Sequence, residues 1–521
     1  MQVLLTADKW EQYGSIYLRG RCYQGTMPCA LSLLAQNLDS FDTAEQVAAF
    51  LQTQRGEFSV VIDKPQLQCI AVSHTRLYPL FYRLYKGNWY VSDDPLKMVK
   101  ESDAISESAC RQYLYTGAPF AGNTLVQFLQ QGKPAYVTCM GTDTVTQVSF
   151  GPYASLSSAS IAADSLDAAF DNVLQTIFKR AVHTIGQRQV VVPLSGGYDS
   201  RLVLSMLHQM GIKNILCYTV GEYHPSEQGV AHQVAKNLQV PLYHIDYRDK
   251  QYRMQQFDSP AFLQYVDAIG AMGNFMWLFE YNAILWLKQQ GLLQNDAVFI
   301  PGHVGDFYAG SHLQKLGINE HDSLSAIQRK LLLHAFEYRK SYFDTSFKKE
   351  VKQALHALSG QGAPYQTALQ FIAENRLAHQ IINSARVYEC LGYDVLLPLC
   401  DVDFVQFFDR LPYKQRADVS FYNEYLLQKV FLPLNIAFKK PSNAKNLQKQ
   451  RLKNALKLLI PRRLYLRFKH RTDLTTETYL LHEMFDELVQ KGMARTPTDY
   501  ACGNELMLNW YLKRVEMQLN F

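Results

Sequence analysis

The sequence predicts an α/β protein of two domains, in which a strand-rich N-terminal part precedes a doubly wound parallel sheet. Short apolar runs separated by turn residues fill residues 1–155. Between residues 165 and 300, strands instead alternate with helices of about a dozen residues, which is typical of parallel βαβ units with helices on both faces. The length of 521 residues also favours more than one core, because single cores stop growing at roughly 250 to 300 residues.

Five runs in the N-terminal part have the apolar composition of short strands. They cover residues 15–18, 58–62, 67–72, 80–82 and 89–92. A Ser- and Ala-rich stretch over residues 154–164 comes next, and after it a helix is expected over 166–184, where apolar residues recur at helical spacing. We therefore expect one domain at residues 1–155 and a second at residues 165–521.

The second domain is expected to continue with strands and helices in alternation. The strands are expected at residues 190–194, 215–220, 242–245 and 297–300, and the helices at 200–210 and 227–238. From about residue 255 onward, helical patterns dominate. The domain is thus predicted to combine a parallel sheet with a helical C-terminal part.

Composition and charge exclude several classes of protein. Apolar residues make up 48% of the chain and charged residues 19%, so the sequence has no signature of disorder. A net charge of +5 over this length does not indicate a nucleic-acid partner. The nine cysteines include no CxxC pair, the start of the chain lacks the basic flank of a signal peptide, and no run reaches the roughly 18 apolar residues of a membrane span. A cytoplasmic protein without a transmembrane span is the expectation.

The most informative segment is a glycine turn, Ser195-Gly196-Gly197-Tyr198-Asp199-Ser200, between a predicted strand and a predicted helix. Glycines let the backbone turn sharply, and N–H groups at the positive end of a helix bind anions such as phosphates. The turn lacks the lysine of a Walker A loop and the third glycine of a dinucleotide fingerprint. Asp199 would repel phosphates unless a cation lay between them, which predicts a Mg²⁺ ligand. The structural alternative is an ordinary turn with a helix-capping acid.

A second turn of the same kind comes after the strand expected at residues 297–300. It reads Pro301-Gly302-His303-Val304-Gly305-Asp306, again with glycines and a carboxylate. Ligands of open α/β sheets bind outside the carboxyl ends of the strands. Two such turns can therefore bring Asp199 and Asp306 around one magnesium–pyrophosphate group.

Five segments, in matching order, resemble motifs of the asparagine synthetase family of N-type ATP pyrophosphatases. Residues 195–200 resemble its SGGxDS pyrophosphate loop, and residues 301–310 resemble its SGxGxDExxGG segment. Residues 218–221 resemble the strand whose backbone receives adenine. Residues 392–401 resemble the GVExRxPFLD segment, and Phe438-Lys439-Lys440 lies where the family has a late catalytic lysine in an RKK-like context. Five ordered matches are far more specific than any one of them.

The resemblance implies an ATP- and Mg²⁺-dependent ligase that adenylates a carboxylate, aspartate by family default, and forms an amide with release of AMP and pyrophosphate. The residues implied in ATP binding are Pro193, Ser195, Gly196, Gly197, Asp199, Ser200, Val220 and Gly302. Asp199 and Asp306 are implied as metal ligands. Lys440 is implied as the catalytic cation that offsets charge as the acyl-adenylate forms or collapses. Lys439 competes with Lys440 for that role, and a solvated lysine pair is the alternative for both.

Three residues depart from the family pattern. His303 replaces the acidic residue of SGxGxDE and Phe307 its final glutamate, while Leu396 replaces the arginine of GVExRxPFLD. His303 is interpreted as catalytic, a neutral base for the attacking amine or ammonia, with a hydrogen-bonded histidine that shapes the pocket as the equal alternative. Leu396 weakens the case for aspartate. The alternative acceptor is another small-molecule or carrier-linked carboxylate, such as a sugar uronate or a peptide, in surface-polysaccharide or peptide biosynthesis.

The N-terminal part resembles the second half of the Ntn-type glutaminase domain of asparagine synthetases, which has an α+β sandwich fold. The resemblance rests on residues 56–63, 76–82 and 90–93. That glutaminase needs a cysteine at its mature N-terminus, whereas the second residue here is Gln2 and the first cysteines are Cys22 and Cys29. We therefore expect a degenerate scaffold domain without glutaminase activity, and ammonia or a substrate amine as the nitrogen donor.

A basic segment, residues 449–471, carries nine Lys and Arg residues and no acid. It is interpreted as a solvated amphipathic face, or alternatively as a dock for an anionic carrier-linked substrate or a leader peptide. Two other classes of function are weighed against the ligase: a non-catalytic relative that keeps the fold, and a PP-loop enzyme that modifies sulfur or tRNA. The second would need a CxxC pair or a tRNA module, and neither is visible. Homodimer formation is left open.

Overall fold

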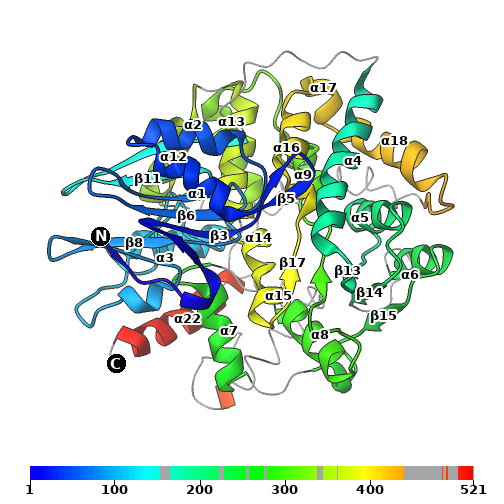
Figure 1. Ribbon diagram of the computed structural model, residues 1–521, viewed down its shortest axis with the longest axis horizontal. Coiled ribbons are helices and arrows are strands. Elements are labelled where there is room, and N and C mark those ends of the chain that lie inside the picture. The colour runs from blue at the N-terminus through cyan, green and yellow to red at the C-terminus, as the bar shows by residue number, and fades with distance from the viewer. Residues whose placement is uncertain are drawn as a thin grey trace.

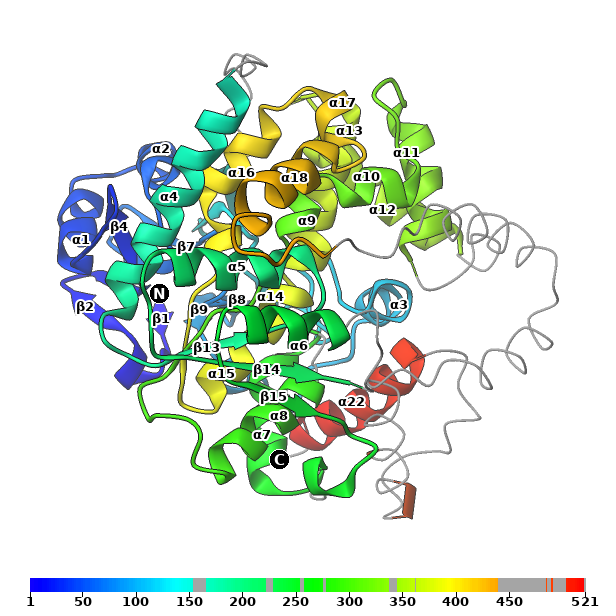
Figure 2. The ribbon, with the colours of Figure 1, turned by 90° about the vertical axis from the view of Figure 1, so that its right-hand side faces the viewer.

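The structure, a computed structural model, has a strand-rich N-terminal part beside a larger part with a parallel sheet (Figures 1 and 2). It describes residues 1–152, 165–221, 228–253, 257–274, 278–336, 344–360, 362–438, 484, 489–490 and 503–519. The two parts share an apolar core, because buried side chains of α3 (Glu107–Thr116) and of the parallel sheet belong to one cluster.

Two sheets form most of the N-terminal part. The first has the order β1 (Gln2–Val3), β9 (Asn88–Ser92), β8 (Phe81–Tyr85) and β10 (Gln130–Gln131). The second has the order β12 (Val145–Ser149), β11 (Tyr136–Met140), β7 (Gln68–Val72), β6 (Phe58–Asp63), β3 (Ile16–Gly20) and β2 (Glu11–Tyr13). A separate hairpin consists of β4 (Cys22–Gln24) and β5 (Met27–Cys29). The five strands expected in this part are confirmed, each to within a few residues.

Strand β6 explains how these sheets pack. Its Val60 and Ile62 belong to the apolar cluster that includes α1 (Leu31–Asp39) and α2 (Ala44–Thr53), whereas Val61 belongs to the cluster shared with β8 and β9. Successive side chains of a strand point to opposite faces, so a continuously apolar strand is buried on both sides. The six-stranded sheet therefore lies between the two helices and the four-stranded sheet.

The parallel sheet carries the architecture of the second part. Its order is β15 (Leu242–Ile245), β14 (Ile215–Val220), β13 (Val190–Pro193), β16 (Val298–Phe299) and β17 (Asp394–Val395), and every pairing is parallel. Figure 2 shows α5 (Tyr198–Gln209) and α6 (Gln228–Asn237) on one side of these strands and α8 (Leu278–Gln289) on the other. The expected parallel sheet with helices on both faces is confirmed, although β16 is shorter than expected and β17 was not predicted.

The strand order changes direction at β13. The chain runs from β13 to β14 and β15 on one side, and it returns to β16 on the other side of β13. Crevices at such a switch point are where open α/β sheets bind their ligands. Helix α5 leaves the end of β13 and α9 (Gly305–Tyr308) comes after β16, so both glycine-rich turns lie at the same edge of the sheet.

Helices make up most of the remaining described residues of the second part. They are α4 (Leu166–Ile185), α7 (Pro260–Gly270), α10 (Ser311–Leu316), α11 (Leu324–Lys330), α12 (Thr345–Leu358), α13 (Pro364–Ile372), α14 (Ile381–Ser384), α15 (Arg386–Cys390), α16 (Val402–Asp409), α17 (Tyr413–Arg416), α18 (Ser420–Tyr425) and α22 (Gly503–Leu519). Helix α22 packs on α3 of the N-terminal part. Among the residues that are described, no helix is long and apolar enough to cross a membrane.

A buried carboxyl group lies between the parallel sheet and α8. Glu280 of α8 is 6% exposed, and it accepts hydrogen bonds from the hydroxyls of Tyr218 on β14 and Tyr388 on α15. Burial raises the pKa of Glu280 from its ordinary value of 4.5 to about 7. The folded protein therefore keeps this acid neutral across a range of pH in which the unfolded chain ionises it.

We expect Glu280 to lower the free energy of unfolding as the pH rises from about 4.5 to about 7. Across that window the unfolded chain has lost the proton and the folded chain still holds it, so ionisation favours the unfolded state. Glu280→Gln should flatten the fall of the free energy of unfolding with pH. Measured against the native protein, the free energy of unfolding of the variant should improve by about 3 kcal/mol between pH 4 and pH 8. Urea unfolding at the two pH values measures the effect, with Glu101→Gln at an exposed position as control. Equal slopes for the two variants would contradict the prediction.

Candidate functional site

Two serine hydroxyls hold the glycine turn in shape. The Ser200 Oγ accepts a hydrogen bond from the Ser195 amide at 3.1 Å, and the Ser195 Oγ accepts one from the Gly197 amide at 3.1 Å. The two hydroxyl oxygens lie 3.0 Å apart, within hydrogen-bond distance. Helix α5 begins directly after Gly197, and no side chain caps it. The positive end of the helix dipole therefore faces the turn, which favours binding of an anion.

Asp199 is held from two sides. Its Oδ2 accepts a hydrogen bond from the Asp306 amide at 2.8 Å, and its Oδ1 accepts one from the Tyr422 hydroxyl of α18 at 2.9 Å. Burial, and after it the charge of Asp199, raise the pKa of Tyr422 well above its ordinary value, so the hydroxyl stays a donor. The structure thus brings together two aspartates that are 107 positions apart in the chain, and it adds a tyrosine that the sequence interpretation missed.

The two turns touch at Gly302. A Cβ atom built on Gly302 would lie 2.3 Å from the Ser200 amide nitrogen, and one built on Gly305 would lie 3.0 Å from the Asp199 Cγ. Only glycine allows this approach, because it has no Cβ. Between these glycines, Val304 has a φ of +60°, a left-handed conformation that costs a β-branched residue about 1–3 kcal/mol. Such strain persists where the surrounding structure fixes the backbone, as it does at many functional sites.

A cation faces the outer side of Asp306. Lys315 Nζ of α10 lies 3.7 Å from Asp306 Oδ2, and the lysine side chain is 57% exposed. Solvent screens such a pair, so the contact adds little to stability, but it supplies positive charge at the rim of the turns. On the same helix, burial and then the charge of Lys315 lower the pKa of His312 to about 3, which keeps that imidazole neutral. No motif in the sequence marks either residue.

His303 is half-buried in the second turn. Burial lowers its pKa from 6.5 to about 4, so the imidazole is neutral at neutral pH. A general base is most effective when its pKa lies near the working pH, and a value near 4 does not provide this. Both interpretations of His303, a base for the attacking amine and a histidine that shapes the pocket, stay predictions.

Pro193 and Val220 lie at the ends of adjacent strands. Pro193 ends β13 in register with Tyr218, and Val220 ends β14 in register with Ile245. Gly221 comes next with a φ of +125°, a conformation that favours glycine. These strand ends open at the edge of the sheet that carries the glycine turn, and residues 222–227 lie outside the described residues.

Residues 392–401 form β17 and the turn after it, beside β16. The buried Leu396 donates its amide to the Phe299 carbonyl at 3.0 Å. A single guanidinium nitrogen of Arg180 on α4, Nη1, donates to both carboxylate oxygens of Asp401 at 2.8 Å, which makes a charge-assisted contact. These contacts hold residues 392–401 beside β16, the strand that precedes the second turn.

Ionic contacts also tie that region to the N-terminal part. Arg21 lies 2.5 Å from an Asp394 oxygen, and Arg55 Nε donates to Asp403 at 2.7 Å. Cys22 and Cys29, the first cysteines of the chain, face each other across the β4–β5 hairpin with their Sγ atoms 2.6 Å apart. Gln2 lies elsewhere, in β1.

Arg201 is another residue that the sequence interpretation missed. It is fully buried beside the glycine turn, where its Nη2 donates to the Gly196 carbonyl at 3.0 Å. Its Nη1 donates to the carbonyls of Ile436 at 3.1 Å and Phe438 at 2.8 Å. Burial lowers its pKa to about 10, which leaves the guanidinium charged at neutral pH. Arg201 could have been recognised from the sequence as a charged residue on the buried face of a predicted helix, because a buried charge needs specific partners.

The roles predicted for several residues after Phe438 stay predictions. Lys439, Lys440 and the basic segment 449–471 lie outside the described residues. Phe438, the last described residue before Lys439, contacts Arg201, which in turn contacts the glycine turn.

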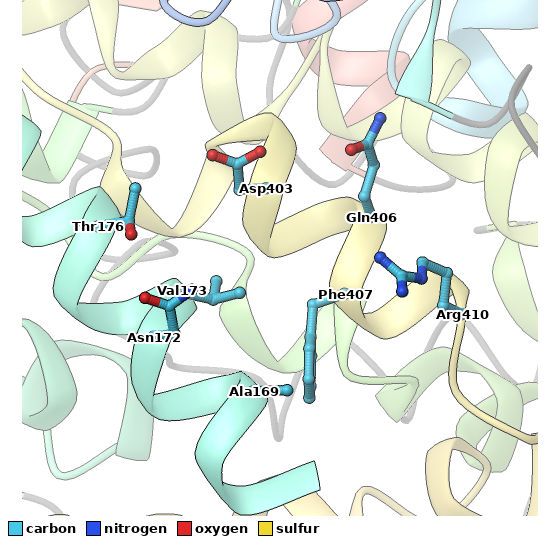
Figure 3. Close-up of a pocket in the computed structure, with 8 residues that line it drawn as sticks. All are labelled: Ala169, Asn172, Val173, Thr176, Asp403, Gln406, Phe407 and Arg410. Carbon is cyan, nitrogen blue, oxygen red and sulfur yellow. The ribbon is translucent and has the colours of Figure 1, made fainter. Parts of the chain in front are cut away.

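A separate cavity lies between α4 and α16 (Figure 3). It has a volume of about 440 Å³ and is lined by Ala169, Asn172, Val173, Thr176, Asp403, Gln406, Phe407 and Arg410. The first four belong to α4, and the others belong to α16 or directly follow it. None of the residues expected in ATP binding lines this cavity, so it is distinct from the candidate site.

A parallel sheet with helices on both faces, and with two glycine-rich turns that meet at its switch point, is typical of α/β proteins whose ligands bind at the carboxyl ends of the strands. The family model for asparagine synthase matches residues 173–502, which is more than half of the chain. The protein therefore belongs to the asparagine synthase family. Membership of this family identifies an ATP-dependent ligase of the amidation type.

The comparisons with curated sequences and with solved structures do not bear on the fold or the activity of this protein. No curated protein sequence matches the chain. The structure of glutamine phosphoribosylpyrophosphate (PRPP) amidotransferase from B. subtilis, complexed with ADP and GMP, is similar with 11% sequence identity over 45% of this chain and 72% of that chain. Its TM-score of 0.17 is too low to support an inference about fold or activity.

Tyr422→Phe should slow the exchange of labelled pyrophosphate into ATP about 10-fold, equivalent to about 1.4 kcal/mol, because Asp199 loses one of the donors that orient its carboxylate. Tyr425→Phe on the same helix is the matched control, since the Tyr425 hydroxyl donates to a different carboxylate, Asp171. Equal exchange rates in the two variants would show that the Tyr422 hydroxyl does not orient Asp199.

Proposed function

We propose that this protein adenylates a carboxylate with ATP and converts the acyl-adenylate into an amide, with release of AMP and pyrophosphate. The observation that carries the proposal is the 2.8 Å hydrogen bond from the Asp306 amide to Asp199 Oδ2. It joins the turns after β13 and β16 at the switch point of the sheet, where ligands of such sheets bind. Family membership supports ATP-dependent amide formation in general.

In this proposal, a carboxylate oxygen of the acceptor attacks the α-phosphorus of ATP, and the bond to pyrophosphate breaks. A nitrogen nucleophile then attacks the acyl carbon, loses a proton and expels AMP. The serines and glycines of the turn would hold the pyrophosphate at the N-terminus of α5. Lys440 would offset the charge that develops on the leaving pyrophosphate, because positioned donors and cations supply most of the stabilisation in phosphoryl-type transfers.

The donor set at the turns fits Mg²⁺. Asp199 and Asp306 offer carboxylate oxygens, the ligands that this ion prefers. Two aspartates are enough for this ion, because it usually takes one or two carboxylates plus phosphates and water. When bound, Mg²⁺ would neutralise charge on the phosphates.

Leu396 bears on the identity of the acceptor. It is 5% exposed and lies where the family has an arginine, so an acceptor with a second carboxylate, such as aspartate, finds no cation at this position. Aspartate is the default substrate of the family. The apolar side chain instead favours an acceptor with a single carboxylate, such as a sugar uronate or a peptide.

Ammonia or a substrate amine is the proposed nitrogen donor, and we expect no release of glutamate from glutamine. The cysteines nearest the start of the chain face each other in a hairpin, and burial raises the pKa of the Cys22 thiol, which makes it a poor nucleophile. Glutamate measured in the presence of glutamine and ATP checks the expectation. Glutamate release that a thiol alkylator abolishes would contradict it.

A screen of carboxylic acids for AMP release, with ammonium as nitrogen source, tests the proposed function. Asp199→Ala serves as the blank, because it removes the carboxylate that the two turns share. Exchange of labelled pyrophosphate into ATP isolates the adenylation step from amide formation. Binding of MgATP without exchange in the presence of any acid would identify a non-catalytic relative instead.

A further inference from the structure

The β4–β5 hairpin brings two free cysteines into contact. Cys22 of β4 and Cys29 of β5 are partners in the strand register, and their Sγ atoms lie 2.6 Å apart. Both thiols are free in the structure. A disulfide requires two cysteines on neighbouring segments whose Cβ atoms are directed toward each other, and register partners with touching sulfur atoms meet that requirement.

The backbone of the hairpin keeps the two cysteines opposite each other. Gly25 begins its two-residue turn with a φ of +61°, a conformation that tight hairpin turns favour at glycine. The Tyr23 amide donates to the Arg55 carbonyl at 2.9 Å, which ties β4 to the chain before β6. The pairing of Cys22 with Cys29 is therefore set by the turn and by backbone hydrogen bonds.

The same hairpin holds α4 of the second part. Strand β5 packs beside α4 (Figure 1). The Arg180 Nε of α4 donates to the Gly25 carbonyl at 2.8 Å. The Tyr23 hydroxyl and the Thr184 Oγ1 lie 2.9 Å apart, within hydrogen-bond distance. Both contacts start from residues between the two cysteines, so a bond that joins the cysteines would restrain the backbone that makes these contacts.

We propose that Cys22 and Cys29 are a site of reversible disulfide formation, and that this bond locks the β4–β5 hairpin and strengthens its hold on α4. Arg180 extends the effect toward residues 392–401, because it donates to the Gly25 carbonyl through Nε and to Asp401 through Nη1. The inference does not depend on the proposed ligase reaction.

A small disulfide such as glutathione disulfide is the oxidant of this reaction. Cys29 is half-buried and Cys22 is 1% exposed, so the oxidant reaches Cys29 first. The Cys29 thiolate attacks one sulfur of glutathione disulfide, the bond between the two glutathione sulfurs breaks, and one glutathione leaves as a thiolate. The result is a mixed disulfide between Cys29 and glutathione.

Cys22 completes the exchange. Burial raises the pKa of its thiol, so its thiolate is scarce, but contact with the Cys29 sulfur makes the second step intramolecular. The Cys22 thiolate attacks Cys29 Sγ and expels the second glutathione. Two protein thiols are thereby oxidised to one disulfide, one glutathione disulfide is reduced to two glutathiones, and the two thiol protons pass to the leaving thiolates.

Alkylation after equilibration in glutathione buffers tests the bond itself. Trypsin releases both cysteines in one peptide, residues 22–55, because no Lys or Arg lies between Arg21 and Arg55. As the buffer becomes more oxidising, this peptide should change from carrying two alkyl groups to carrying none, with two hydrogen atoms fewer than the reduced peptide. A peptide that keeps both alkyl groups in every buffer, or that ends as a glutathione adduct at Cys29, would overturn the proposal.

The same titration in urea separates the folded hairpin from the spacing of the cysteines in the chain. The folded hairpin holds the two sulfurs in contact, which raises their effective concentration. The value of [GSH]²/[GSSG] at half-oxidation should therefore be at least about tenfold higher for the folded protein than for the unfolded chain. Equal values would show that the fold does not favour the bond, and the proposal would fail.

Hydrogen exchange tests the effect of the bond on α4. Oxidation should slow amide exchange of residues 180–185 at least about threefold in the native protein, because the locked hairpin restrains the end of α4. Cys29→Ser, at a half-buried position, should show no such change. Equal exchange in the oxidised and the reduced native protein would overturn the proposed hold on α4.

Cys139→Ser is the matched control. Cys139 of β11 is the register partner of Cys69 of β7, so this variant also loses one cysteine of a cross-strand pair, but it keeps the hairpin. Its α4 amides should respond to oxidation as those of the native protein do. If the response disappeared in Cys139→Ser and persisted in Cys29→Ser, it would belong to the other pair, and the proposal would fail.

Discussion

Asp199→Asn should lower the rate of pyrophosphate exchange into ATP about 1000-fold, because it removes one of the two carboxylate charges that would hold Mg²⁺ at the phosphates. The substitution keeps the size of the side chain, and the amide oxygen can still accept from the Asp306 amide or from the Tyr422 hydroxyl. The fold should therefore survive while the site loses its charge. Exchange measured with the best acid, over a range of Mg²⁺ concentrations, checks the prediction.

Asp171→Asn is the matched control for this loss of charge. Asp171 accepts a hydrogen bond from Tyr425, just as Asp199 accepts one from Tyr422, and both tyrosines lie on α18. The control should exchange at the native rate. Thermal unfolding of both variants separates a loss of fold from a loss of chemistry. If Asp199→Asn exchanged pyrophosphate at a rate within about tenfold of native, Asp199 would not be a metal ligand.

The elements that carry the site could be predicted because their local patterns are strong. Buried parallel strands read as continuous apolar runs bounded by turn residues, and β13, β14 and β15 lie where those runs predict them. Helix α5 begins at Tyr198, earlier than expected, because the glycine turn itself provides the start of the helix. The Tyr198 ring packs against Phe431 at 5.3 Å, a tertiary contact that the helical pattern does not contain.

The contacts that hold the two turns together could not be predicted from the sequence. Tyr422 lies 223 positions from Asp199, and a single hydrogen bond over such a separation leaves no periodic pattern in the chain. Strand β17 has two residues, too few to show a pattern, and its place is set by pairing with β16. Cys22 and Cys29 have no recognised spacing as a pair, yet the hairpin places them in register. In each case the tertiary fold determines which residues come into contact. The local sequence pattern predicts only whether a segment forms a helix or a strand.

Gly302→Ala is expected to have the largest steric effect on the site. A Cβ there would lie 2.3 Å from the Ser200 amide nitrogen and 2.5 Å from the Ser200 Cα, and neither backbone atom can swing aside. The substitution must push the second turn away from α5, and with it the Asp306 amide that binds Asp199. A displacement of about 1 Å at a reacting centre costs about 100-fold in rate, so we expect at least that loss of exchange. Overpacking should also cost about 1–3 kcal/mol of stability, measured by urea unfolding.

Gly211→Ala separates the two effects, because it changes a glycine at the other end of α5. Gly211 lies just beyond the helix with a φ of +83°, and a Cβ built there meets no atom within 4 Å. Left-handed backbone should cost the alanine variant about 1 kcal/mol of stability, with no clash and no shift of either turn. Its exchange rate should therefore be native. If Gly302→Ala also exchanged at the native rate despite a loss of stability, close contact between the two turns would not be what sets the geometry of Asp199 and Asp306.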